Sequence, residues 1–222
     1  MTGNINSINT HDELLQAYTT LFMFLGGSVS MPPEQSGLPH LCDNGLLRNL
    51  PVDSQNHHFL NASRLLKSPC LRKEHCRIAI GGNFTDLMSD ASSSSAYPAA
   101  SHWISSGIAP GEHHDRLCEI YHRYGYHREK ICKLEADHLG IELLFLNLLL
   151  EKYLTEDDYQ IKEMIRKDLL SFINDEMLRW LPLWAEKVSE RSVTKCYTGI
   201  SGLIIGSLED VKEILGSQKF GL

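Results

Sequence analysis

Long apolar stretches and a basic start are both missing from this sequence. No continuous apolar run reaches the ~18 to 20 residues that a membrane-spanning helix needs, so we expect no stable membrane insertion. Asp12 and Glu13 stand before the first apolar stretch, whereas a secretory signal peptide would carry positive charge there. These two absences predict a cytoplasmic protein.

An excess of positive charge is also absent. The chain has 21 Lys and Arg residues against 28 Asp and Glu residues, which gives a formal net charge of −7. Proteins that bind nucleic acid in general need a basic surface. We therefore expect no nucleic-acid partner.

Motifs for redox, metal or nucleotide chemistry are scarce. The six cysteines are scattered without a Cys-x-x-Cys pair, and in a chain without a secretion signal we expect them to be reduced thiols. The sequence has no Gly-x-x-x-x-Gly-Lys loop and no Gly-x-Gly-x-x-Gly turn, which are the usual cradles for phosphates. No cofactor is predicted.

Runs in which apolar and polar residues alternate, as in half-buried strands, are missing too. Apolar residues instead recur at helical spacing over about 10–25, 112–124, 155–172, 176–190 and 192–215. This periodicity predicts an all-α fold.

Glycine and serine mark where these helices are expected to stop. Gly26-Gly27 should end the first helix, and Gly206-Ser207 is a candidate break in the last one. The segment 90–106 contains four consecutive serines, so it is expected to be a flexible connection or a loop used for binding. A short helix is expected near 43–49, within a stretch rich in proline.

What the sequence does have is an acidic and imidazole cluster at the start of an apolar helix. Glu135, Asp137 and His138 come first, and from there to residue 150 only Glu142 is charged. A helix of this kind, predicted over 134–153, must be buried on most sides. Charged groups at its start cost desolvation energy unless each finds a partner. The cluster therefore needs a structural or a functional explanation.

The structural explanation is helix capping. Glu135 and Asp137 would cap the helix and offset its N-terminal dipole. His138 and Glu142 are four residues apart on a helix, and they would bond to each other.

A metal site is a second explanation. Glu135-x-x-His138 has the spacing of ligands in di-iron helical bundles, and Glu119-x-x-His122 repeats it. Such bundles also need single Glu ligands from two further helices, whereas Glu142 stands on the same helix as one of the pairs. A helical-bundle metal-binding enzyme is therefore kept as the alternative. A thiol–imidazole pair between His122 and a neighbouring cysteine has no recognisable nucleophile context.

Several short motifs resemble those of the TorD/DmsD-type redox-enzyme maturation chaperones. The resemblance covers about residues 70 to 215, and the motifs occur in the family's order. They are Ser95-Ala96-Tyr97, Tyr121-His122-Arg123-Tyr124-Gly125, Glu135 with Asp137-His138, Glu142-Leu143-Leu144-Phe145-Leu146, and Trp180-Leu181-Pro182 followed by Trp184.

The sequence also departs from this family. Ala136 stands where the family usually has a proline before Asp-His, and Glu176-Met177 occupies the place of a histidine often found before Trp-Leu-Pro. Residues 28–58, rich in Pro and His, have no counterpart that we can place. These departures bear on the identity of the client enzyme.

The resemblance implies a chaperone that is not an enzyme. Such a protein binds the twin-arginine leader of a molybdenum-cofactor oxidoreductase subunit, and it holds that precursor back from export until the cofactor is inserted. The fold implied is a single all-α domain over 1–222, with lobes of about 1–90 and about 110–222 and a hinge loop at about 90–109. Exchange of segments about this loop would give a domain-swapped homodimer in place of a monomer.

Arginine-bearing peptides need recessed carboxylates beside apolar walls. The carboxylates would come from three of the acidic residues above, and aromatic side chains would form the walls. His138 is expected to orient Asp137 or Glu142 and to tune the site by protonation. The predicted peptide-binding residues are Tyr97, Trp103, Tyr121, Glu135, Asp137, His138 and Glu142.

Overall fold

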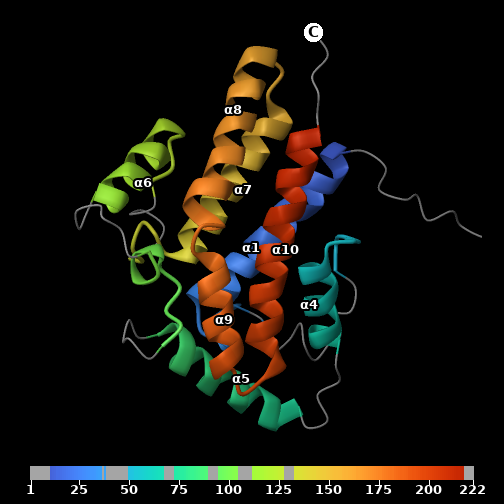
Figure 1. The fold of residues 1–222 in the computed structure, drawn as a ribbon, viewed down its shortest axis with the longest axis vertical. Helices are drawn as coiled ribbons and strands as arrows, with labels where there is room; N and C mark the ends of the chain where they lie inside the picture. Colours follow the sequence, from blue (N-terminus) through green and yellow to red (C-terminus); the bar gives the residue numbers. More distant parts are fainter. Residues whose placement is uncertain are drawn as a thin grey trace, which may run out of the picture.

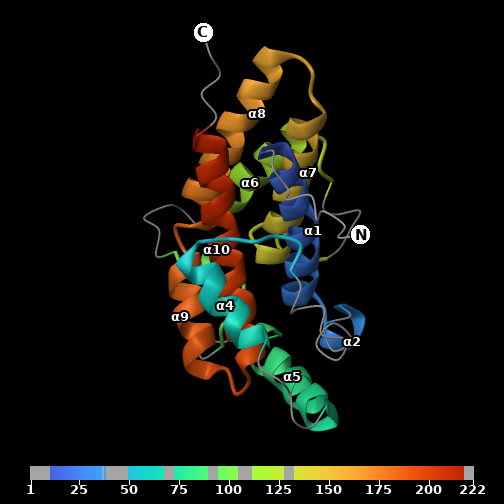
Figure 2. The same cartoon turned by 90° about the vertical axis from the view of Figure 1, so that its right-hand side faces the viewer.

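Helices make up nearly all the regular structure of the chain. A computed structural model describes residues 11–36, 38, 50–67, 73–89, 95–104, 112–127 and 133–217. These residues contain no strand, only an isolated bridge between Ala99 and His138. The predicted all-α fold is confirmed, and the helices form an elongated bundle (Figures 1 and 2).

The helices follow one another along the chain with short connections. They are α1 (His11–Ser30), α2 (Pro33–Ser36), α4 (His57–Lys67), α5 (Lys73–Met88), the 3-10 turn η2 (Ala100–His102), α6 (Glu112–Arg123), α7 (Leu139–Thr155), α8 (Tyr159–Ser171), the π-helical turn η4 (Phe172–Met177), α9 (Leu181–Arg191) and α10 (Lys195–Ser217). None of the described helices is both long and apolar enough to cross a membrane.

The helix α7 lies in the core of the bundle, packed along α1 (Figure 2). Leu139, Leu143, Leu146 and Leu150 are fully buried, as expected from a stretch with a single charge. The helix begins at Leu139, later than the predicted residue 134. His138 has an extended backbone and stands just outside the helix.

Glycines in α1 and α10 mark close helix crossings rather than helix ends. The helix α1 runs through Gly26-Gly27 to Ser30, and α10 runs unbroken through Gly206. A Cβ atom on Gly26 would lie 3.5 Å from the carbonyl oxygen of Gly140 in α7. A Cβ atom on Gly206 would lie 2.6 Å from a backbone nitrogen of α4. Both predicted breaks are wrong, because tertiary packing uses these glycines for close approach.

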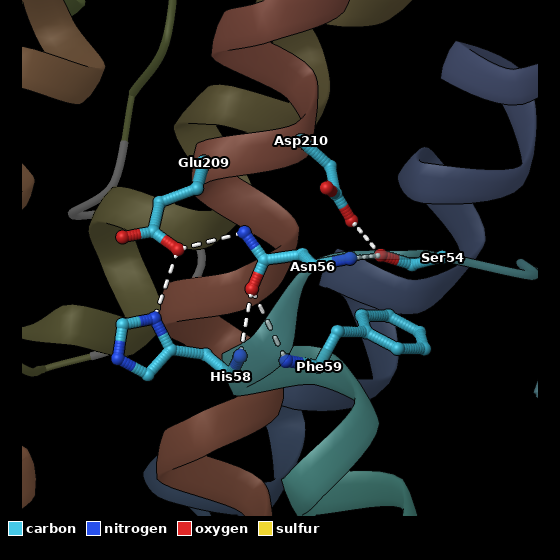
Figure 3. Close-up of polar contacts among 6 residues, drawn as sticks. All are labelled: Ser54, Asn56, His58, Phe59, Glu209 and Asp210. Carbon is cyan, nitrogen blue, oxygen red and sulfur yellow. Dashed lines mark hydrogen bonds and ion pairs between the residues drawn. The ribbon is translucent and has the colours of Figure 1, made fainter.

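Polar contacts hold the start of α4 against α10 (Figure 3). The side-chain oxygen of Asn56 accepts a hydrogen bond from the backbone N–H of His58 at 2.8 Å, and its amide nitrogen donates to Glu209 at 2.8 Å. The ring Nδ1 of His58 lies 2.9 Å from the same Glu209 oxygen. One turn away, Ser54 donates to Asp210 at 2.6 Å. The network fixes the helix cap and the helix crossing together.

Several predictions meet the structure only in part. The short helix near 43–49 and much of the serine-rich run lie outside the described residues, and the division into lobes stays a prediction. Cys118 and Cys196 are free thiols as expected. Cys76 takes part in a disulfide bond, so the prediction of six reduced cysteines is wrong at this position.

Candidate functional site

The Asp-His turn before α7 is bound to the segment 95–104 by backbone hydrogen bonds. The N–H of Ala100 donates to the carbonyl of Asp137 at 3.0 Å, and the N–H of Leu139 donates to the carbonyl of Pro98 at 2.7 Å. The Asp137 carboxylate accepts a further bond from the N–H of Ser101 at 2.7 Å. The Asp137 side chain therefore positions the remainder of a serine-rich segment that was expected to be flexible.

Three of the seven predicted residues lie together where solvent reaches them. The hydroxyl of Tyr97 donates to Glu135 at 2.8 Å, and the indole N–H of Trp103 donates to the carbonyl of Tyr97 at 2.8 Å. Glu135 is exposed, and the two aromatic side chains are partly exposed. An exposed carboxylate beside two aromatic rings is a surface that a peptide can contact directly.

The other four predicted residues are buried. Asp137 is 4% exposed, His138 2%, Tyr121 1% and Glu142 0%. The Tyr121 hydroxyl donates to the carbonyl of Ala136 at 2.7 Å, so this ring packs beneath the turn. Contact between these four residues and a peptide stays a prediction. Such contact requires that the element covering them moves.

The helix cap differs from the one predicted. His138 is the N-cap of α7, and its ring Nδ1 accepts a hydrogen bond from the N–H of Gly140 at 3.1 Å. Asp137 and Glu135 bond instead to the segment 95–104, and neither oxygen of Glu142 has a hydrogen-bond partner. The expected His138–Glu142 bond is therefore wrong.

The His138 imidazole is neutral over most of the pH range. Burial lowers the pKa of His138 to about 4, while the charges of Glu135 and Asp137 act in the opposite direction without compensating. A neutral ring also suits its Nδ1 to accept the capping bond.

Glu142 is a fully buried carboxyl group without a partner. Burial raises the pKa of Glu142 well above its ordinary value, and the nearby charges of Asp137 and Glu176 raise it further. The group is protonated while its neighbourhood stays closed. Buried polar groups without hydrogen bonds destabilise a fold, so a group of this kind points to a role outside folding.

We expect the Glu142→Gln variant to be more stable than the wild type at neutral pH. Above the ordinary pKa of glutamate the unfolded chain loses the proton and the folded chain keeps it. The wild type therefore loses about 1.4 kcal/mol of unfolding free energy per pH unit until the folded pKa is reached. Gln does not titrate, so its advantage should grow from about pH 4 upward in urea denaturation.

The matched control for this experiment is Glu186→Gln, because Glu186 is an exposed carboxyl group on α9. Its stability difference from the wild type should not change with pH. Equal stability of Glu142→Gln and wild type from pH 4 to 8 would show that the Glu142 carboxyl is ionised and compensated.

A functional residue that the sequence reasoning missed is Glu176. It is 6% exposed, and it accepts a hydrogen bond from Arg116 of α6 at 2.7 Å. The His113 ring, also on α6, lies 3.7 Å from the same carboxylate. The π-helical turn η4 sets the direction of the Glu176 side chain, and no local sequence pattern indicated that turn.

A pocket of about 460 Å³ opens beside Glu176, between α6 and the rod formed by α8 and η4. Acidic side chains outnumber basic ones in its lining. The lining residues are Arg116, Glu119, Ile120, Arg123, Asp168, Ser171, Phe172, Asp175 and Glu176.

The metal alternative gains no support from the geometry. Within the described ranges, no three His, Cys, Asp or Glu side chains come together as metal ligands. Glu119 and His122 lie exposed on α6, whereas His138 is buried with its Nδ1 bound to a backbone N–H. The two Glu-x-x-His motifs do not form one site.

Comparison with known proteins identifies relatives along most of the chain. A family model described as nitrate reductase delta subunit matches residues 56–186, which is more than half of the chain. The Chaperone protein TorD of Photobacterium profundum is 26% identical over 200 residues, covering 89% of this chain and 82% of the relative. The protein of the same name from Aliivibrio fischeri is 29% identical over 149 residues, covering 65% and 68%. That from Vibrio cholerae is 23% identical over 173 residues, covering 78% and 76%.

These matches confirm the resemblance found in the sequence motifs. Relatives that share the greater part of their length with this chain are named chaperones, and none of these names describes a catalyst. The chain belongs to the nitrate reductase delta subunit family and, within it, to the TorD/DmsD-type chaperones, which are not enzymes.

Proposed function

We propose that this protein is a cytoplasmic chaperone of a molybdenum-cofactor oxidoreductase subunit. It binds the twin-arginine leader of the precursor and keeps it from export until the cofactor has been inserted. The observation that carries this proposal is the match to TorD chaperones over 89% of the chain. The protein acts as a monomer or as a homodimer that exchanges segments about the loop at 90–109.

The chemistry around the Asp-His turn supports a leader-binding role. A twin-arginine leader presents guanidinium groups followed by an apolar stretch. Glu135 is an exposed carboxylate for one guanidinium, and Tyr97 and Trp103 offer aromatic surface beside it. Arginine–carboxylate pairs are strong and geometrically specific because two parallel N–H···O bonds can form.

Titration calorimetry with a synthetic twin-arginine leader peptide tests the proposal. We expect binding that weakens with added salt, because exposed charge pairs are screened. A peptide with Lys-Lys in place of Arg-Arg should bind less tightly, since lysine cannot form the paired bonds. Absence of heat and of any shift in thermal stability with the Arg-Arg peptide would reject leader binding.

The Asp137→Asn variant should bind the leader about 30-fold more weakly, or about 2 kcal/mol. Its carboxylate holds the N–H of Ser101, and with it the segment that carries Tyr97 and Trp103. Asp157→Asn, which changes an exposed carboxylate between α7 and α8, is the control with the same charge change. Circular dichroism confirms that both variants fold. Unchanged affinity of a folded Asp137→Asn protein would remove this residue from the binding site.

A further inference from the structure

We propose that Glu176, with Glu142 behind it, is a binding site for an arginine of the leader, and that Arg116 of α6 occupies this site in the free chaperone. The inference rests on the proposed function and adds to it the residues that receive the arginines. It also assigns to α6 the role of a cover that carries an internal competitor.

The contact between Arg116 and Glu176 joins a partly exposed cation to a buried anion. The side chain of Glu176 is 7% exposed and that of Arg116 is 44% exposed, with 2.7 Å between Nη2 and Oε2. The same guanidinium nitrogen lies 3.2 Å from Nδ1 of His113. A guanidinium that reaches from the surface into a recessed carboxylate is the arrangement expected for a bound arginine ligand.

A second arginine of α6 repeats the contact two turns further along. Arg123 lies 3.5 Å from Asp168 of α8, and this carboxylate also accepts a bond from Tyr124 at 2.6 Å. Both arginines and both carboxylates line the same 460 Å³ pocket. The pocket therefore holds two arginine-bearing contacts side by side, as a peptide with two adjacent arginines requires.

The acidic cluster beneath α6 has more capacity than Arg116 uses. Glu142 is fully buried with both carboxylate oxygens unpartnered, and its protonation is coupled to the charges of Asp137 and Glu176. A guanidinium has five N–H donors in a planar fork, so one that enters more deeply can bond to several acids at once. Glu142 is the unpartnered acceptor that such a ligand would satisfy.

The helix α6 is placed to act as a cover. It stands on the outside of the bundle beside α7 and α8 in Figure 1. Its inner face carries Leu117 and Tyr121, which are 0% and 1% exposed, and Tyr121 bonds to the turn that precedes His138. Movement of this one helix would uncover Tyr121 together with the buried acids. These are the predicted site residues that the free protein keeps from solvent.

Exchange of one arginine for another explains how the buried acids become available. In the free protein Arg116 and Arg123 neutralise part of the pocket and hold α6 in place. A leader arginine that binds Glu176 displaces Arg116, and the carboxylate stays paired throughout. Because the internal arginine competes, the leader's apparent affinity is lower than the site's own affinity.

Calorimetry with the twin-arginine leader peptide tests this site through opposite effects of two variants. Glu176→Gln should weaken leader binding by about 10-fold, because a carboxylate partner is lost. Arg116→Gln should tighten binding by about 5-fold, because the internal competitor is removed. Arg116→Lys keeps the charge but lacks the fork, and it should give a smaller gain.

Arg191→Gln is the matched control, since it removes an exposed arginine of α9 and changes the net charge equally. It should leave the affinity unchanged. Leader binding by the wild type with no gain in Arg116→Gln and Arg116→Lys, or with equal gains in Arg116→Gln and Arg191→Gln, overturns the internal-arginine site alone. No leader binding by the wild type overturns the proposed function and this inference with it.

Discussion

The wild-type protein is expected to lose far more stability in acid than its His138→Asn variant. The unfolded chain takes up a proton on His138 near pH 6.5, whereas burial keeps the folded pKa at about 4. Between these values each pH unit removes about 1.4 kcal/mol of unfolding free energy, for a total of about 3 kcal/mol at pH 4. Above pH 7 the ring is neutral in both states, and this difference vanishes.

Asn suits the experiment because its side-chain oxygen can replace Nδ1 as the acceptor for the N–H of Gly140 without titrating. The readout is the change in unfolding free energy from pH 7.5 to 5, measured by urea denaturation. It should be about 2 kcal/mol larger for the wild type. His75→Asn, at an exposed position of α5, should behave as the wild type does. Parallel pH profiles for wild type and His138→Asn would show that the buried ring is protonated in the fold.

The Gly206→Ala variant should lose about 2 to 3 kcal/mol of unfolding free energy. An added Cβ atom would lie 2.6 Å from the backbone nitrogen of Phe59 and 3.0 Å from its Cα. Backbone atoms cannot rotate away as a side chain can, so α4 must move from α10. That movement would also strain the contacts of Asn56 and His58 with Glu209. Urea denaturation measures the loss.

Gly216→Ala is the control within the same helix. No atom lies within 4 Å of the position that its Cβ atom would take. Alanine has the higher helix propensity, so this variant should be unchanged or more stable by up to about 1 kcal/mol. A loss in Gly216→Ala equal to that in Gly206→Ala would mean that the effect comes from the helix itself and not from its contact with α4.

The large features of this protein could be predicted from local sequence. Residues 139–150 contain one charge, and burial on nearly every side follows directly from that composition. Trp180 and Trp184 were predicted to pack in the core or at an interface, and both are fully buried. Their packing also positions the site, because the Trp184 indole donates to the carbonyl of Ala96 at 2.8 Å.

Smaller features were decided by contacts between distant residues. Glycine normally favours a helix end, yet Gly26 and Gly206 lie inside helices because a second helix passes against each of them. His138 and Glu142 stand at bonding distance along an ideal helix, but the helix starts one residue after His138. The imidazole therefore caps the helix and leaves the carboxyl without a partner.

The sequence by itself determined the all-α fold, the buried rod of α7 and the family, because each of these is written in local periodicity or in short motifs. Only the tertiary structure decided which acidic groups lie open and which lie covered. Glu135 reaches solvent, while Asp137, Glu142 and Glu176 lie in the interior near α6. The physical reason is that burial and charge pairing depend on what packs against a side chain. The partner of Glu176 is Arg116, sixty residues earlier in the chain.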